Sequence, residues 1–97
     1  MIYISGQITG LELKEAQANF EAAEQHLSEH GHTEIVNPMK LVPYHPDLTW
    51  KDYMIEDIKA IFDCKGMYML SNWKESKGAK IEHAIAEHLG LSILYQH

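Results

Sequence analysis

A chain of 97 residues is long enough for one domain with one hydrophobic core and leaves little length for a second. Hydrophobic residues make up 45% and charged residues 23%, the balance of a folded globular chain rather than a disordered one. The net charge is -6 and the lysines form no run, which argues against a nucleic-acid polymer as partner. A small nucleotide stays compatible with this charge, since backbone amides alone can hold one phosphate.

Cys64 is the only cysteine, so the sequence predicts no internal disulfide, and no thiol cluster suggests a metal. The chain begins directly in a strand-like run, without a basic segment followed by a long apolar stretch. We therefore expect no signal peptide, no membrane span and a cytoplasmic location. Neither a metal nor another cofactor is expected.

The first part of the chain predicts a strand followed by a helix, because a short apolar run gives way to apolar residues at helical spacing. Residues 1–5, MIYIS, are apolar and rich in strand-forming types, and the glycines of GQITG mark the turn after them. Residues 13–30 predict a helix that Gly31 ends. Its apolar positions recur at steps of three and four: Ala16, Phe20, Ala23 and Leu27.

The middle of the chain predicts a second strand, a loop and a second helix. TEIVNP, residues 33–38, is a minimal strand stopped by Pro38. Residues 39–48 hold two further prolines and are expected to form a loop across the carboxyl edge of the sheet. Thr49 is a suitable cap for a helix over residues 50–64.

The last third repeats the order of strand, loop and helix. Residues 67–70 predict a strand, residues 71–76 a loop, and a helix follows that ends at Gly90. LSILYQ, residues 91–96, predicts a final strand. Four short strands alternating with three helices predict one α/β domain over residues 1–97, with three layers and a parallel sheet of four or five strands.

Two acids stand out because they occupy faces that look buried. Glu82 lies in the second turn of the last helix and shares its face with Ala79 and Ala86, so its side chain leans back toward the crevice at the strand ends. An ordinary surface glutamate near a helix start would fit the same spacing. Asp57 interrupts the stripe Trp50, Met54, Ile61 and Cys64, which is otherwise apolar.

Burying an unpaired charge costs several kcal/mol, so Asp57 needs a partner or a function there. At the margin of its stripe it could simply pair with Lys65 or a loop amide. Both acids belong to helices that flank the third predicted strand, and Tyr3 can enter the same pocket from the first strand. Two carboxylates beside a small pocket suit chemistry at an anomeric carbon, where one stabilises positive charge and the other handles a proton.

Other residues near the crevice have two interpretations each. Asn37 could bind a ligand or cap its own loop. Trp73 lies in a polar loop and is interpreted as a contact to ligand or to another subunit, whereas Trp50 begins an apolar stripe. The histidines at the end of the first helix are interpreted as solvated rather than as metal ligands: His26, His30 and His32.

Several segments together resemble the nucleoside 2-deoxyribosyltransferase-like superfamily, in particular its small phage and prophage members. They are YISGQITG near the start, NP at 37 and 38, WKDYMIEDIKAI, and MYMLSNWKESKGAKIEHAIAEHLG, whose S-x-G-A-x-x-E pattern is the most specific. The resemblance implies a flavodoxin-like fold. It also implies cleavage of the N-glycosidic bond of a nucleoside or nucleotide.

The resemblance further implies roles for single residues. Glu82 matches the nucleophile that attacks the sugar, Asp57 the acid that holds the sugar and handles the proton of the departing base, and Tyr3 the residue that orients the nucleophile. Ser76 and Gly78 match positions that bind a 5'-phosphate in the monophosphate hydrolases, and Gly6 lets the backbone pass close to the ligand.

Two departures from the pattern matter for the reaction. Lys65 follows Cys64 where close relatives usually carry an acid, and the aspartate found before the last motif of true transferases is replaced by other residues. Hydrolysis or weak transfer is therefore expected rather than efficient base exchange. In larger relatives a neighbouring subunit completes the site, so a homo-oligomer is expected. The alternative function is a module that binds a nucleotide or an ADP-ribose-like ligand without turnover.

Overall fold

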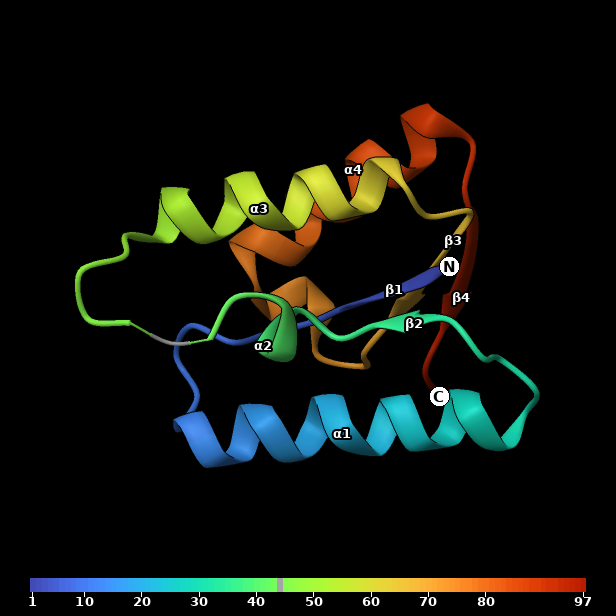
Figure 1. Cartoon of the computed structure of the whole chain (residues 1–97), viewed down its shortest axis with the longest axis horizontal. Helices are drawn as coiled ribbons and strands as arrows, with labels where there is room; N and C mark the ends of the chain where they lie inside the picture. Colours follow the sequence, from blue (N-terminus) through green and yellow to red (C-terminus); the bar gives the residue numbers. More distant parts are fainter. Residues whose placement is uncertain (44) are drawn as a thin grey trace.

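A computed structural model describes residues 1–43 and 45–97, and its centre is one sheet of four parallel strands (Figure 1). The strand order is β2-β1-β3-β4. The strands are β1 (Ile2–Ser5), β2 (Ile35–Val36), β3 (Gly66–Met69) and β4 (Ser92–Tyr95). The α-helices are α1 (Leu13–Glu29), α2 (Pro38–Leu41), α3 (Trp50–Phe62) and α4 (Lys77–Leu89), and a short 3-10 helix, η1 (Trp73–Glu75), precedes α4.

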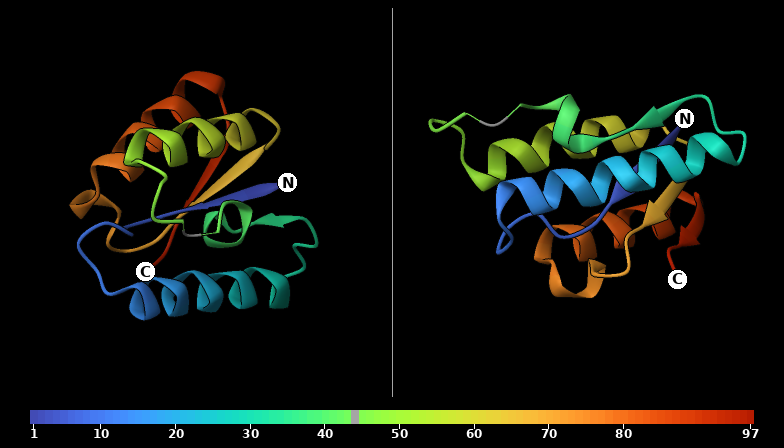
Figure 2. Two further views of the ribbon diagram at one scale, coloured as in Figure 1. Left: turned by 60° about the vertical axis from the view of Figure 1, so that its left-hand side comes forward. Right: turned by 90° about the horizontal axis from the view of Figure 1, so that it is seen from below.

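Helices cover both faces of the sheet, with α1 on one side and α3 and α4 on the other (Figures 1 and 2). Successive side chains of β1 point to opposite faces of the sheet, as in any β-strand, and therefore pack against the two helix layers in turn. Ile2 and Ile4 pack in the core with Phe20 of α1. Tyr3, between them in sequence, packs in the second core with Ile61 of α3.

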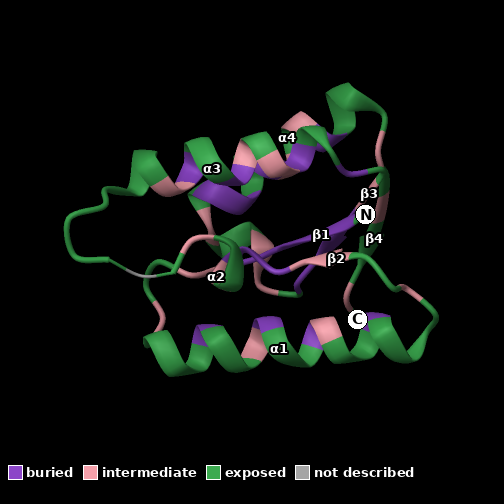
Figure 3. Ribbon diagram, viewed as in Figure 1, coloured by how far each residue is buried: buried purple, intermediate pink, exposed green. Residues whose placement is uncertain are grey.

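This arrangement confirms the predicted fold class: the chain is an α/β, flavodoxin-like domain of three layers with a four-stranded parallel sheet. Central strands of such sheets are covered on both faces, and β1 is accordingly buried along its whole length. The outer strand β4 is mostly exposed, and the contrast between the two strands is visible in Figure 3. Among residues 1–43 and 45–97, no helix has the length and apolar character needed to cross a bilayer.

The observed elements differ from the predicted ones mainly after β2. A loop was expected over residues 39–48, of which residue 44 lies outside the described part, but the chain first forms α2. Pro38 occupies the first turn of this helix, where a proline fits, and Asn37 caps it. Strand β2 has only two residues, because the chain turns into α2 directly after Asn37. Helix α3 ends at Phe62, two residues before the expected end.

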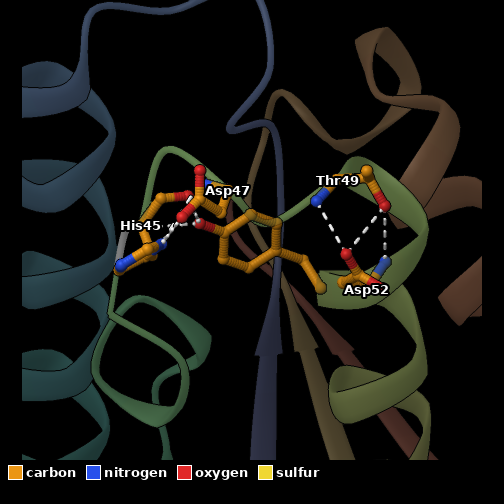
Figure 4. A network of polar contacts seen from close by, with 5 residues as sticks. His45, Asp47, Thr49 and Asp52 are labelled. Carbon is orange, nitrogen blue, oxygen red and sulfur yellow. Dashed lines mark hydrogen bonds and ion pairs between the residues drawn. The ribbon is translucent and has the colours of Figure 1, made fainter.

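The two helices that carry the acids have well-defined N-termini. Thr49 and Asp52 form a capping box at the start of α3, in which each side chain accepts a hydrogen bond from the other residue's backbone N–H (Figure 4). At the start of α4 the hydroxyl of Ser76 accepts from the N–H of Ala79 at 3.1 Å. Both caps fix the helix starts near the carboxyl ends of the strands, where parallel sheets bind ligands.

Candidate functional site

A cavity of about 420 Å³ opens where β1 ends. Its walls come from the segment after β1, the start of α1, α2, and the first turns of α3 and α4. The residues that line it are Tyr3, Gly6, Ile8, Thr9, Leu11, Leu13, Gln17, Phe20, Pro38, Met39, Val42, Trp50, Tyr53, Met54, Asp57, Ser76, Gly78, Ala79 and Glu82. Asp57 and Glu82 are the acids of this set, and most of the other side chains are apolar. The cavity is therefore an apolar pocket with two carboxyl groups, a common composition of small-molecule sites.

Glu82 lies inside the protein, with only 5% of the residue exposed. The small residues on its helix face, Ala79 and Ala86, are buried with it and bring α4 close to the sheet. Tyr3 donates a hydrogen bond to Oε2 at 3.0 Å, and Ser5 donates one to Oε1 at 2.7 Å. Each carboxyl oxygen of Glu82 thus has a hydroxyl donor from β1, which fixes the plane of the carboxyl group.

Asp57 reaches the same cavity from α3 and is 7% exposed. Met54 and Ile61 flank it on the buried face of the helix, and Cys64 is buried just beyond the helix end. Trp50 belongs to this stripe but is 38% exposed and lines the cavity. The aspartate therefore faces the protein interior, as its place in the apolar stripe predicts.

Burial changes the acidity of both carboxyl groups. Burial is the largest cause that raises the pKa of Asp57 to about 7, and the Tyr3 hydroxyl acts in the opposite direction. Burial, and after it the charge of Asp57, raise the pKa of Glu82 to about 8, although hydrogen bonds from Ser5 and Tyr3 act in the opposite direction. The two acids interact through their charges, so they titrate as a pair near neutral pH.

This pair can divide its chemical work between a charged and a neutral member. Two buried carboxyl groups that interact this strongly do not both ionise readily, so near neutral pH one keeps a proton while the other is an anion. The anion can attack or stabilise a cationic centre, and the neutral acid can donate a proton. Tyr3, whose own pKa burial raises well above its ordinary range, stays a neutral hydrogen-bond donor beside them.

Three further residues that the sequence analysis predicted at the site line the cavity. They are Ser76 and Gly78 of the S-x-G pattern, and Gly6 of the first loop. Gly78 lies where α4 approaches α3, because a β-carbon there would be 3.2 Å from the Met54 sulfur. Gly6 has its own packing reason. A β-carbon at this position would lie 2.5 Å from the Leu70 side chain, so the glycine makes room for a core residue as well as lining the cavity.

Two predicted binding residues have other contacts. The Asn37 side chain accepts from the N–H of Met39 at 2.9 Å and donates to Glu24 at 3.1 Å, so it caps α2 and ties it to α1. Trp73 stacks on His83 with ring centroids 4.3 Å apart. Neither Asn37 nor Trp73 is among the residues that line the cavity.

Ser5 is the polar contact of Glu82 that the sequence analysis missed. The signal was available, because residues two apart on a strand point to the same side and Ser5 follows Tyr3 by two. A serine at the end of an apolar strand is also a common turn residue, so its type alone indicates no site. The apolar cavity wall was missed as well, since residues such as Leu11 and Val42 lie in segments without a periodic pattern.

The histidine cluster lies apart from the cavity. The rings of His26 and His30 lie next to each other near the end of α1, tilted by 40° with centroids 4.3 Å apart, and both residues are exposed. Within the described part of the chain, no group of three or more potential ligands is placed to hold a metal ion.

Comparison with known proteins gives a family for almost the whole chain. Residues 1–95 match the family model described as "Domain of unknown function (DUF4406)". A search of the curated proteins returned no match, and neither did a search of the solved structures. The matched range includes the sheet, the cavity and both acids, and the chain is thus a member of the DUF4406 family.

Proposed function

We propose that the protein cleaves the N-glycosidic bond of a nucleoside or nucleotide through a glycosyl-enzyme on Glu82. One observation supports this most: Glu82 and Asp57, from two different helices, are both buried and both line one cavity beside Tyr3. The resemblance of the S-x-G-A-x-x-E segment to the deoxyribosyltransferase-like superfamily supports the same reaction.

In the first step an oxygen of Glu82 attacks C1' of the sugar. The C1'–N bond breaks and its electron pair leaves with the base, while Asp57, in its neutral form, gives the base a proton. In the second step Asp57 takes a proton from water, the water oxygen bonds to C1', and the Glu82 carboxylate is released. The raised pKa values keep one proton on the pair near neutral pH, and the reacting form is the one in which this proton lies on Asp57 and Glu82 is ionised.

The wall of the cavity suits the breaking of the C1'–N bond, because it shields the reacting groups from bulk water. Apolar and aromatic side chains make up most of its wall, and among them Trp50 and Tyr53 offer flat surfaces for a base. Water is restricted by such a wall, and hydrogen bonds to developing charge are stronger where water is excluded. We propose hydrolysis or weak transfer, in the cytoplasm and by a homo-oligomer.

The experiment is to incubate the protein with a panel of deoxynucleosides and their 5'-monophosphates and to follow free base by chromatography. We expect release by the wild type and its loss in Glu82→Ala. We expect Asp57→Asn to slow it by about a hundredfold or more, the usual size of a proton-transfer contribution. Glu87→Gln is the matched control, because Glu87 is an exposed glutamate of the same helix, and it should leave release unchanged.

A second candidate function is binding without turnover. Carboxyl groups whose pKa values lie at about 7 and about 8 are both largely protonated below neutral pH, and protonated acids donate hydrogen bonds to a neutral ligand. A nucleotide or ADP-ribose-like ligand that raises the melting temperature and is recovered intact would support this candidate. Free base that persists unchanged in Glu82→Ala would remove Glu82 from the proposed reaction.

A further inference from the structure

We propose that Ser5 is a positioning residue for the Glu82 carboxyl group: it anchors Oε1 from behind and leaves Oε2 as the oxygen that reacts. The inference rests on the proposed function for its consequence in catalysis, but the contact itself is independent of any substrate. Ser5 is fully buried, at 0% exposure, and its hydroxyl lies 2.7 Å from Oε1.

The two hydroxyl donors of Glu82 bind different oxygens of its carboxyl group. Tyr3 lines the cavity and donates to Oε2, whereas Ser5, which donates to Oε1, is not among the lining residues. In this proposal Oε2, which is bound by the donor that lines the cavity, is the oxygen nearer to an occupant of the cavity. An anchored Oε1 prevents rotation of the carboxyl group about its last bond, which keeps Oε2 directed at a bound sugar.

The serine also affects the charge of the nucleophile. Two titratable groups face the Glu82 carboxyl, namely Asp57 from α3 and Tyr3 from β1, and burial together with the charge of Asp57 disfavours the ionised form of Glu82. A hydroxyl that donates to the carboxylate favours the ionised form instead. Ser5 is such a donor, at the shorter of the two distances.

Ser5→Ala and Ser5→Cys test this role. Alanine removes the donor and leaves space, whereas cysteine fills the space with a slightly larger side chain that is a much weaker donor, so the pair separates lost hydrogen bonding from lost packing. Ser92→Ala is the control, because Ser92 is an exposed serine of β4. Folding of each variant is checked by thermal denaturation. If Ser5→Ala does not fold, Ser5→Cys carries the measurement.

The first readout needs no substrate: carbon NMR of labelled glutamate follows the ionisation of Glu82 in the empty protein. In both Ser5 variants the pKa of Glu82 should rise above the wild-type value, and in Ser92→Ala it should not. The second readout is kcat for base release, which should fall by about tenfold to a hundredfold at neutral pH. KM should change little, because Ser5 is not among the residues that line the cavity.

Each outcome decides a different point. An unchanged pKa of Glu82 in Ser5→Ala and Ser5→Cys would overturn the proposal, as would a kcat equal to that of the wild type. A raised pKa of Glu82 together with a lower kcat and an unchanged KM supports it. If the pKa of Glu82 rises in the Ser5 variants but the wild type releases no base from any substrate, the proposed function is wrong, and the positioning of Glu82 by Ser5 is still supported.

Discussion

The hydroxyl of Tyr3 lies 3.0 Å from Oε2 of Glu82, although 79 positions separate the two residues in the chain. The contact joins the central strand β1 to α4 inside the protein, where both residues are almost completely buried. A hydrogen bond to a carboxylate in such surroundings is stronger than one at the surface. Tyr3 thus connects the core of the sheet directly to the proposed nucleophile.

Removal of the Tyr3 hydroxyl should slow the proposed reaction without unfolding the protein. In Tyr3→Phe the ring stays in the core, but the donor to Oε2 is lost. Because this donor lowers the pKa of Glu82, its removal raises that pKa and reduces the fraction of ionised nucleophile at neutral pH. We expect kcat to fall by about tenfold to a hundredfold, the usual value of a hydrogen bond to a charged group.

Tyr68→Phe is the matched control for this variant. Tyr68 is a buried tyrosine of the neighbouring strand β3, but it packs in the core on the α1 side and does not line the cavity. Its kcat should equal that of the wild type. Equal activity of Tyr3→Phe and wild type across pH 5–9 would show that the Tyr3 hydroxyl has no part in the reaction.

The buried acids should make the protein less stable as pH rises. Their ordinary values are 3.8 for Asp57 and 4.5 for Glu82, and in the folded protein they are about 7 and about 8. Between these limits the folded state holds more protons than the unfolded state, so the free energy of unfolding decreases with pH. Stability is therefore highest below about pH 4 as far as this pair is concerned, and the loss is complete above about pH 8.

Glu82→Gln isolates this effect, because the amide has the shape of the acid but no charge. Urea denaturation at pH 5 and pH 8 should show that the variant loses less stability between the two values than the wild type. At pH 8 it should be the more stable protein by about 1 kcal/mol or more. A wild type whose stability is equal at both pH values, or a variant with the same slope, would contradict the buried-pair interpretation.

Much of the fold followed from sequence because the local signals agree with one another. In the first helix, Ala16, Phe20, Ala23 and Leu27 recur at helical spacing, and all four are buried in α1. Glycines and caps also marked element ends correctly, as at Gly90, where φ is +75°. Helix α2 was missed because four residues are too few for a periodic pattern and prolines close by favour a loop.

The site was predictable where one residue type breaks a pattern. Asp57 stands out in an apolar stripe and Glu82 among small residues, and both are buried at the cavity. Ser5 and the apolar residues of the cavity wall were not predicted, because their roles depend on which segments of the chain meet in the folded structure. The role of Asn37 could not be predicted from the sequence, because a polar residue at a strand end can equally well bind a ligand or cap a helix. The structure shows that it caps α2 through the N–H of Met39 and also binds Glu24.

Gly6→Ala should destabilise the protein through a steric clash. The new β-carbon would lie 2.5 to 2.7 Å from side-chain atoms of Leu70, which is buried in the core and cannot move aside freely. We expect a loss of about 1–3 kcal/mol in the free energy of unfolding, the usual cost of overpacking. Gly66→Ala is the control, since the nearest atom to its β-carbon is 3.4 Å away. Equal stability of the two variants would contradict this prediction.

Asn37→Ala should reduce stability without affecting ligand binding. The change removes the cap of α2 and the hydrogen bond to Glu24, which together should cost about 1–2 kcal/mol in urea denaturation. KM should stay at the wild-type value, because Asn37 does not line the cavity. Asn37→Asp keeps the capping oxygen but loses the donor to Glu24, so its stability should not exceed the wild type's. A raised KM with unchanged stability would instead make Asn37 a binding residue.

The two tryptophans should respond differently to a ligand. Trp50 lines the cavity and carries the Lys77 ammonium 4.9 Å from its ring centroid, so an occupant of the cavity changes the surroundings of its ring. Trp73 stacks on His83 outside the lining. Addition of a nucleoside should therefore change the fluorescence of Trp73→Phe, which retains Trp50, and leave Trp50→Phe almost unchanged. The reverse result would place the ligand against Trp73, as the polar surroundings of that residue in the sequence first indicated.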